Sequence, residues 1–148
     1  MTAFRRIKPN GKPRRRNEQP EHKMQVALFQ WAKLAANVDH RLNLLFAIPN
    51  GGHRDPRTAA QLKAEGVKSG VPDIFLPVSR AGYHGLWLEL KAGKNKPTDQ
   101  QTAWHKELTR QGYAVHVIHD EWTIAVQIIE DYLAGKLSAP ACVLTTDS

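Results

Sequence analysis

Apolar residues recur along this chain with two different spacings. Over residues 20–36 they return every three or four positions, which predicts an amphipathic helix that has a proline in its first turn. A helix opened by Thr98 and ended at Gly112 is expected over residues 98–110, and the same spacing predicts a last amphipathic helix over residues 121–134. A shorter helix is expected over residues 58–65 and is closed by Gly66.

Short apolar or alternating runs between these helices predict strands. They cover residues 42–48, 73–78, 86–91 and 113–118. The polar stretch 79–85 joins two of these runs and is expected to form a hairpin loop. The order helix, strand, helix, strand, strand, helix, strand, helix predicts an α/β fold with a mixed central β-sheet flanked by helices.

The composition is typical of a single folded domain and gives no sign of a membrane span, a secretory signal or a disulfide. A chain of 148 residues suits one domain, and 41% hydrophobic residues with four Trp predict a folded core. There is no run of 18 apolar residues and no apolar stretch behind the basic N-terminus, so we expect neither a membrane span nor a secretory signal. Cys142 is the only cysteine, which excludes an internal disulfide and a cysteine-based zinc site. We therefore expect a cytoplasmic protein.

The net charge of +7 comes from the N-terminal segment. Seven basic side chains precede the first acidic one, Glu18: Arg5, Arg6, Lys8, Lys12, Arg14, Arg15 and Arg16. With its Pro and Gly residues and few apolar ones, the segment 1–17 is expected to be a disordered arm. It would either bind nucleic-acid phosphates or serve only as a solubilising terminus. Residues 18–136 are the predicted domain, and residues 137–148 the predicted tail.

Two acidic residues and a lysine flank the central strands. Asp73 follows Val71-Pro72, and Glu89 and Lys91 lie two apart in the run Leu86–Lys91, so they share one face of a strand. Charged groups on a half-buried sheet need a partner, a metal or a substrate. If the Asp73 segment pairs beside this strand, the three groups converge and suit Mg²⁺ facing a phosphate. The alternative is an ion pair in which one carboxylate neutralises Lys91.

These residues belong to a longer pattern. It consists of the runs Gly66-Val67-Lys68-Ser69-Gly70-Val71-Pro72-Asp73 and Glu89-Leu90-Lys91-Ala92-Gly93-Lys94. The pattern resembles the PD-(D/E)XK nucleases, with their restriction-endonuclease-like core, and is most similar to their VRR-NUC family, the virus-type replication-repair nucleases. The resemblance covers residues 18–134 without a departure at the catalytic positions. It is also carried by Glu21 with Gln25, Asn50-Gly51-Gly52 with Arg54, Gln101 with Trp104, and Gly112-Tyr113.

The resemblance implies a metal-dependent DNA endonuclease. Small single-domain members of the family are regarded as homodimers that act on branched DNA such as four-way (Holliday) junctions. Asp73 and Glu89 would bind Mg²⁺, or Mn²⁺ in its place, the Leu90 carbonyl would be a further ligand, and Glu21 would complete the sphere directly or through water. Lys91 would orient the attacking water and stabilise charge on the phosphate, or act as a base.

Two of the residues implied by the family have a simpler explanation. Glu21 lies in the first turn of a predicted helix, where a carboxylate stabilises the helix dipole without any catalytic role. Thr98-Asp99-Gln100-Gln101 forms a capping box, in which Gln101 bonds back to the start of its own helix. The family places both side chains at the active site.

Several residues are candidates for contacts to the DNA backbone. A glycine turn lets a phosphate approach the main chain closely, and neighbouring cations add charge. The alternatives are an ordinary turn and solvated surface charges. The candidates are Asn50, Gly51, Gly52, Arg54, Lys68, Lys94 and Lys96.

The seven His residues form no recognised zinc motif, so zinc is not expected. Two other functions compete with the DNA endonuclease. One is a non-catalytic nucleic-acid-binding module on a nuclease scaffold, and the other is a flap or RNA-directed nuclease. The joint presence of Asp73, Glu89 and Lys91 favours an enzyme, because phosphate binding alone gives no reason to cluster carboxylates.

Overall fold

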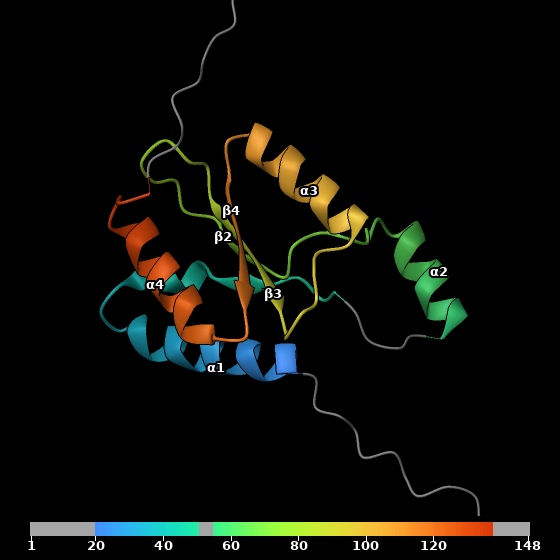
Figure 1. The fold of residues 1–148 in the computed structure, drawn as a ribbon, viewed down its shortest axis with the longest axis horizontal. Helices are drawn as coiled ribbons and strands as arrows, with labels where there is room; N and C mark the ends of the chain where they lie inside the picture. Colours follow the sequence, from blue (N-terminus) through green and yellow to red (C-terminus); the bar gives the residue numbers. More distant parts are fainter. Residues whose placement is uncertain (1–19, 51–54, 138–148) are drawn as a thin grey trace, which may run out of the picture.

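The computed structural model describes residues 20–50 and 55–137, and its centre is a mixed four-stranded sheet (Figure 1). The strands lie in the order β1-β2-β3-β4; β2 is antiparallel to both of its neighbours, and β3 and β4 are parallel. The predicted α/β fold with a mixed sheet flanked by helices is therefore confirmed. The elements are α1 (Pro20–Ala35), η1 (His40–Leu44), β1 (Phe46–Ala47), α2 (Pro56–Ala64), β2 (Ile74–Leu76), β3 (Leu86–Lys91), α3 (Asp99–Arg110), β4 (Ala114–His119) and α4 (Trp122–Leu133).

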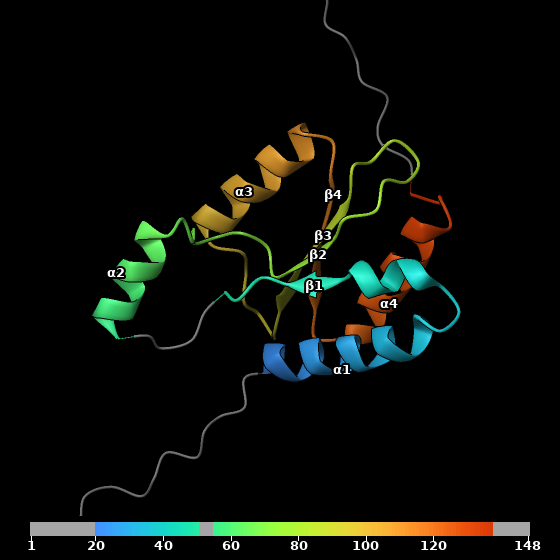
Figure 2. The ribbon, with the colours of Figure 1, turned by 180° about the vertical axis from the view of Figure 1, so that it is seen from behind.

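Helices cover both faces of the sheet (Figures 1 and 2). α1 and α4 pack together on one face, where the apolar side chains of β3 meet those of the two helices. α3 lies over the other face and is the crossover that a parallel β3–β4 pair requires. The core contains Leu28, Leu86, Leu88, Leu90, Ile118 and Ile129, all at most 1% exposed.

The strand β3 is buried on both faces, which matters for the charges it carries. Leu88 and Leu90 face the core, and Glu89 between them is only 1% exposed. Lys91 at the end of the strand is 8% exposed. The sheet therefore removes both charged groups from water, and the neighbouring elements must stabilise them.

The predicted strand over residues 42–48 is wrong in its first half. Residues His40–Leu44 form a 3-10 helix, and only Phe46–Ala47 pair with β2. The cause is Asp39, whose side chain accepts a hydrogen bond from the Arg41 amide and starts a helical turn. Leu42 and Leu45 lie three apart and are both buried, which fits a helix of three residues per turn.

The remaining elements follow the predictions closely. The helix predicted over residues 58–65 begins two residues earlier, because Asp55 caps it and Pro56 occupies its first turn. The strand predicted over residues 73–78 is shortened to Ile74–Leu76, and it forms the predicted antiparallel hairpin with β3. α2 buries none of its side chains and projects from the body (Figure 1). The basic arm lies outside the described residues, as does the tail apart from Leu137.

No helix among the described residues is long and apolar enough to cross a membrane.

Candidate active site

Asp73 is bound to the strand that carries the other charged groups. It immediately precedes β2, and its Oδ2 accepts a hydrogen bond of 2.8 Å from the Leu90 amide. The Asp73 carbonyl accepts a second one, of 2.7 Å, from the Ile48 amide. Because the N–H and C=O of a strand residue point to the same side, the Leu90 carbonyl is directed toward the side where Asp73 lies. The predicted convergence of Asp73 with the β3 strand is thus present.

Glu89 lies at the centre of the site, and its two carboxyl oxygens differ. Oε1 accepts a hydrogen bond of 2.6 Å from Gln101 Nε2 and lies 3.3 Å from Lys91 Nζ. Oε2 is buried and has no hydrogen-bond partner, although His105 Nε2 lies 3.5 Å away. The ion pair that competed with the metal-site interpretation therefore exists, but it engages only one oxygen.

The ion pair with Lys91 does not balance the cost of burying Glu89. Burial and the nearby Asp73 carboxylate raise the pKa of Glu89 to about 8, against the opposing effect of Lys91. A carboxyl with this pKa is largely protonated at neutral pH unless a cation compensates its charge. Ionising both carboxyls costs free energy because their negative charges repel each other. A divalent cation bound between them would stabilise the doubly ionised state.

Gln101 joins the two roles that its sequence position allowed. Its side-chain Oε1 accepts a hydrogen bond from the backbone N–H of Thr98 at 2.9 Å. The Thr98 hydroxyl accepts one from the backbone N–H of Gln101, so the predicted capping box is present. Its Nε2 donates to Glu89. The side-chain amide of Gln101 makes the cap and the active-site contact at the same time, because its oxygen accepts one hydrogen bond and its nitrogen donates the other.

Glu21 reaches the end of β3 from the first turn of α1. Its Oε1 accepts from the Ala92 amide at 3.2 Å, one residue after Lys91. Asp120 holds the same loop from the other side, since its Oδ1 accepts from the Gly93 amide at 2.5 Å. Glu21 is therefore beside the site rather than merely at a helix end, although its contact in this structure is with the backbone.

The segment before Asp73 is fastened to α3. Trp104 Nε1 donates to the Ser69 carbonyl at 3.1 Å, and the Ser69 hydroxyl donates to the Gln100 side chain at 3.0 Å. Gly70 has φ +88°, and a Cβ there would lie 2.9 Å from the Gln100 backbone. Asn50 closes the other side, because its side-chain amide donates to the Val71 carbonyl. The family pattern before Asp73 is thus a docking segment that fixes this carboxylate.

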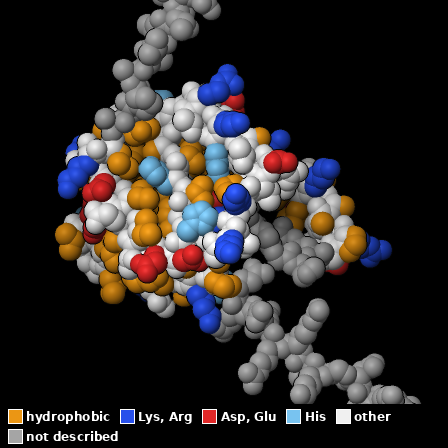
Figure 3. Space-filling model, viewed as in Figure 1, with side chains coloured by type: hydrophobic (Ala, Val, Ile, Leu, Met, Phe, Trp, Pro, Cys, Tyr) orange, Lys and Arg blue, Asp and Glu red, His pale blue; other side chains and the backbone are white. Residues whose placement is uncertain are grey.

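The predicted DNA contacts lie on the surface as far as they are described. Asn50, Lys68, Lys94 and Lys96 are all exposed. Gly51, Gly52 and Arg54 lie outside the described residues. On the face seen in Figure 3, blue Lys and Arg side chains are dispersed, some at the rim and some beside the pale-blue His side chains nearer the middle. A concentrated basic patch is not visible on this face, and by sequence the seven excess positive charges equal the seven basic residues that precede Glu18.

His105 is the site residue that the sequence analysis did not identify. It lies on α3 one turn after Gln101, with its side chain 15% exposed. Burial lowers its pKa, Lys91 lowers it further, and Asp73 opposes both. We therefore treat its approach to Glu89 as a contact of a neutral imidazole and not as an ion pair. The sequence signal for it was its spacing of four residues from Gln101.

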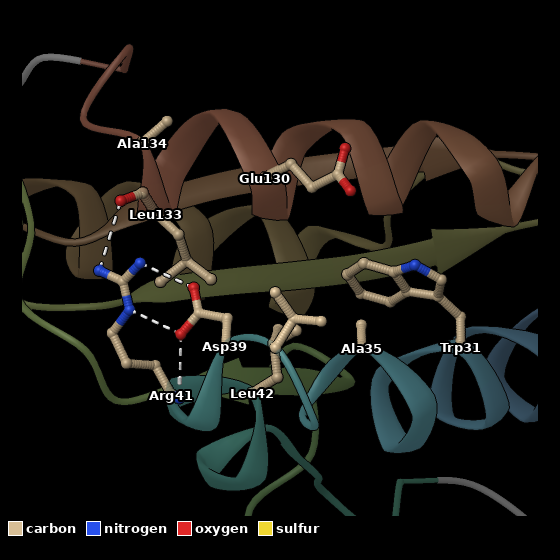
Figure 4. A pocket seen from close by; sticks show the side chains of 9 residues that line it. Trp31, Ala35, Asp39, Arg41, Leu42, Glu130, Leu133 and Ala134 are labelled. Carbon is tan, nitrogen blue, oxygen red and sulfur yellow. Dashed lines mark hydrogen bonds and ion pairs between the residues drawn. The ribbon is translucent and has the colours of Figure 1, made fainter.

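Two shallow grooves on the described part of the chain differ in their position relative to these residues. A groove of about 450 Å³ lies between α3 and β4, is lined by His105, Lys106, Arg110 and Val117 among others, and borders the site. The other, of about 460 Å³, lies between α1, η1 and α4 (Figure 4). Trp31, Leu42 and Leu133 form its apolar lining, and Asp39 pairs with Arg41 at its edge. It is on the opposite side of the sheet from Glu89 and is separate from the site.

The donor set fits a hard cation only if the backbone and water contribute. Among the described residues, no group of three His, Cys, Asp or Glu side chains is close enough to hold a metal ion. Asp73 and Glu89 supply two carboxylates, and the Leu90 carbonyl is a third oxygen. Mg²⁺ commonly uses one or two carboxylates and keeps several waters, so this set is compatible with it. The partnerless Oε2 of Glu89 is the atom with unused acceptor capacity.

Comparison with known proteins agrees with this arrangement. The family model of the VRR-NUC domain matches residues 14–122. The chain belongs to the VRR-NUC family. A solved structure described as a VRR_NUC domain protein has a TM-score of 0.63 and 25% identity to it, over 78% of this chain and 89% of that one. No curated protein matches the chain. The VRR-NUC domain is a nuclease domain, so the resemblance inferred from the motifs is confirmed, and the chain is a member of a nuclease family.

Proposed function

We propose that this protein is a Mg²⁺-dependent endonuclease that hydrolyses phosphodiester bonds of branched DNA, with four-way junctions as the favoured substrate. The observation that carries the proposal is Glu89, a buried carboxyl beside Asp73 with one oxygen lacking a partner and a pKa raised to about 8. Such a group is costly to ionise, and Gln101 and Lys91 contact only its Oε1, so a cation at Oε2 would offset the remaining cost.

The residues have separable roles in this reaction. Asp73, Glu89 and the Leu90 carbonyl would hold Mg²⁺, with Mn²⁺ as a substitute, and Glu21 would contribute through water. The bound ion would polarise the scissile phosphate and lower the pKa of its water. Hydrolysis forms a P–O bond to the water oxygen and breaks the P–O bond to the leaving sugar oxygen, which takes up a proton. Lys91, held 3.3 Å from Glu89 Oε1, would donate to the attacking water or to the phosphate, which favours an orienting and charge-stabilising role over that of a base.

The preference for branched DNA and the homodimer are proposed together. Resolving a four-way junction takes two symmetric incisions, which a pair of chains related by a two-fold axis supplies. The basic arm would add contacts to phosphates outside the cut site. The molar mass in solution tests the dimer. A monomer at all working concentrations would contradict it.

The function is tested by cleavage of a labelled four-way junction with Mg²⁺. Wild type is compared with Asp73→Asn and Lys91→Ala, and Asp131→Asn on α4 is a matched control away from the site. We expect cleavage by wild type and the control and loss of cleavage in both site variants. Linear duplex, flap and RNA junction of matched sequence define the substrate. Binding without cleavage by wild type would instead support a non-catalytic module, and undiminished cleavage by both variants would refute the site assignment.

A further inference from the structure

Two buried atoms of the site lack hydrogen-bond partners, and they face each other. Glu89 Oε2 and His105 Nε2 are both closed off from solvent and lie 3.5 Å apart. This separation is longer than an ordinary hydrogen bond of about 2.7–3.2 Å. A buried polar atom without a partner forfeits its hydration and destabilises the fold. Two such atoms, one of them on the central carboxyl of the site, therefore need a functional explanation.

Both oxygens of Glu89 are approached from one helix. Gln101 and His105 are four residues apart on α3 and therefore lie on the same face. Gln101 Nε2 binds Oε1, and His105 Nε2 faces Oε2. The helix is fixed by its capping box and by the bond of Trp104 to the Ser69 carbonyl, so the imidazole has a defined position.

We propose that His105 is a positioning residue that holds Glu89 in its metal-binding orientation by donating a hydrogen bond from Nε2 to Oε2. The inference rests on the proposed function, because it concerns Glu89 as a metal ligand. Oε1 already meets Gln101 and Lys91, so Oε2 is the oxygen with capacity for a cation. A carboxylate oxygen has two lone pairs. His105 would occupy one of them and leave the other for the ion.

In this arrangement histidine stays outside the coordination sphere. Mg²⁺ prefers oxygen ligands, so the imidazole does not bind the ion itself. Groups that orient a metal ligand from outside are a regular part of metal sites, and their loss typically weakens metal binding about 10- to 100-fold. The same helix would thus fix both edges of the carboxyl plane, with an amide on one oxygen and an imidazole on the other.

The experiment measures metal binding without any substrate. The full-length metal-free protein is titrated with Mn²⁺ in a calorimeter, and wild type is compared with His105→Leu and His105→Gln. Leucine fills the space without a donor, whereas glutamine keeps a donor N–H. We expect His105→Leu to weaken Mn²⁺ binding about 10- to 100-fold. His105→Gln should recover most of that loss. Lys106→Ala, at the exposed neighbouring position, should bind like wild type.

Thermal unfolding of the metal-free variants separates positioning from packing. We expect the Leu and Gln variants to differ in Mn²⁺ affinity while their melting temperatures stay close to each other. Wild-type affinity in His105→Leu would overturn the inference. So would equal weakening in both variants.

The tautomer of His105 gives a second, independent readout. In ¹⁵N spectra of the metal-free protein at about pH 9, above the Glu89 pKa of about 8 so that the carboxylate can only accept, we expect the His105 proton on Nε2; the His105 signals are assigned from the His105→Gln variant. A proton on Nδ1 would overturn the inference. If wild type binds no Mn²⁺, the proposed function fails, whereas a proton on Nδ1 overturns the hydrogen bond from His105 to Glu89 independently of metal binding.

Discussion

The side chain of Gln101 connects the first turn of α3 to the carboxyl of Glu89. Its oxygen accepts from the Thr98 amide at 2.9 Å, and its nitrogen donates to Glu89 Oε1 at 2.6 Å. The amide orientation is determined by these two partners, because reversing it would place an N–H against the Thr98 N–H. The start of the helix and the orientation of the buried carboxyl are therefore coupled through one residue.

Because of this coupling, Thr98→Ala and Gln101→Ala should lose similar stability but differ in DNA cleavage. Thr98→Ala removes the hydroxyl cap and is expected to cost about 0.5–2 kcal/mol of unfolding free energy. Gln101→Ala disturbs the same cap and also releases Glu89, so its loss of stability should be similar while its junction cleavage falls about 10- to 100-fold further. Urea unfolding and single-turnover cleavage check the two effects. Equal loss of cleavage in both variants would mean that Gln101 acts only as a cap.

The raised pKa of Glu89 predicts how stability depends on pH without metal. Its folded pKa of about 8 lies above the unfolded value of 4.5, so protonation favours the folded state. The stabilisation is complete below pH 4.5 and is lost as pH rises through 8. The loss has an upper limit of about 5 kcal/mol, at about 1.36 kcal/mol per pKa unit.

Urea unfolding of chelator-treated protein between about pH 5 and pH 9 measures this slope. Glu89→Gln is neutral at every pH and nearly the same size, so it should flatten the curve in this range. Added Mg²⁺ should raise the stability of wild type most at high pH and leave Glu89→Gln almost unaffected. A wild-type slope that persists in Glu89→Gln would assign the titration to another group.

Periodicity predicted most of the fold because each long element is locally consistent. α1, α3 and α4 have amphipathic spacing, and α3 also has a capping box that can be read from Thr98 and Gln101. The failure at residues 42–48 has a local cause as well. An apolar run predicts burial but not the conformation that achieves it, and Asp39 decided the outcome in favour of a 3-10 turn.

The charged residues of the site could be selected from the sequence, but not their partners. Strand period placed Glu89 and Lys91 on one face, whereas the convergence with Asp73 depended on the hairpin pairing. The contact of His105 with Glu89 depends on the position of α3 over the sheet, a tertiary relationship that no local pattern specifies. For the same reason the docking of Ser69 and Gly70 on α3 was recognised only as part of a motif.

Two glycines of that motif test whether the docking segment positions Asp73. Gly66 and Gly70 both have positive φ, +97° and +88°, so alanine at either costs about 1–2 kcal/mol from the backbone. A Cβ at Gly66 meets nothing within 4 Å, but at Gly70 it collides with the Gln100 backbone. We expect Gly70→Ala to be the less stable variant in urea unfolding. It should also be the one with weakened Mn²⁺ binding in calorimetry, because the segment must shift Asp73. Equal effects in both would show that only backbone strain matters.

The basic arm is expected to act on affinity and not on chemistry. Replacing its seven Lys and Arg residues by Gln should weaken the binding of the junction. The slope of log K against log salt should become shallower by about 0.9 for each phosphate that the arm no longer neutralises. The cleavage rate at saturating DNA should stay unchanged, because Asp73, Glu89 and Lys91 are held by residues 20–137. Lys33→Gln with Lys136→Gln, both exposed, controls for surface charge in general. An unchanged salt slope would assign the arm to solubility instead, since binding to phosphates must release counterions.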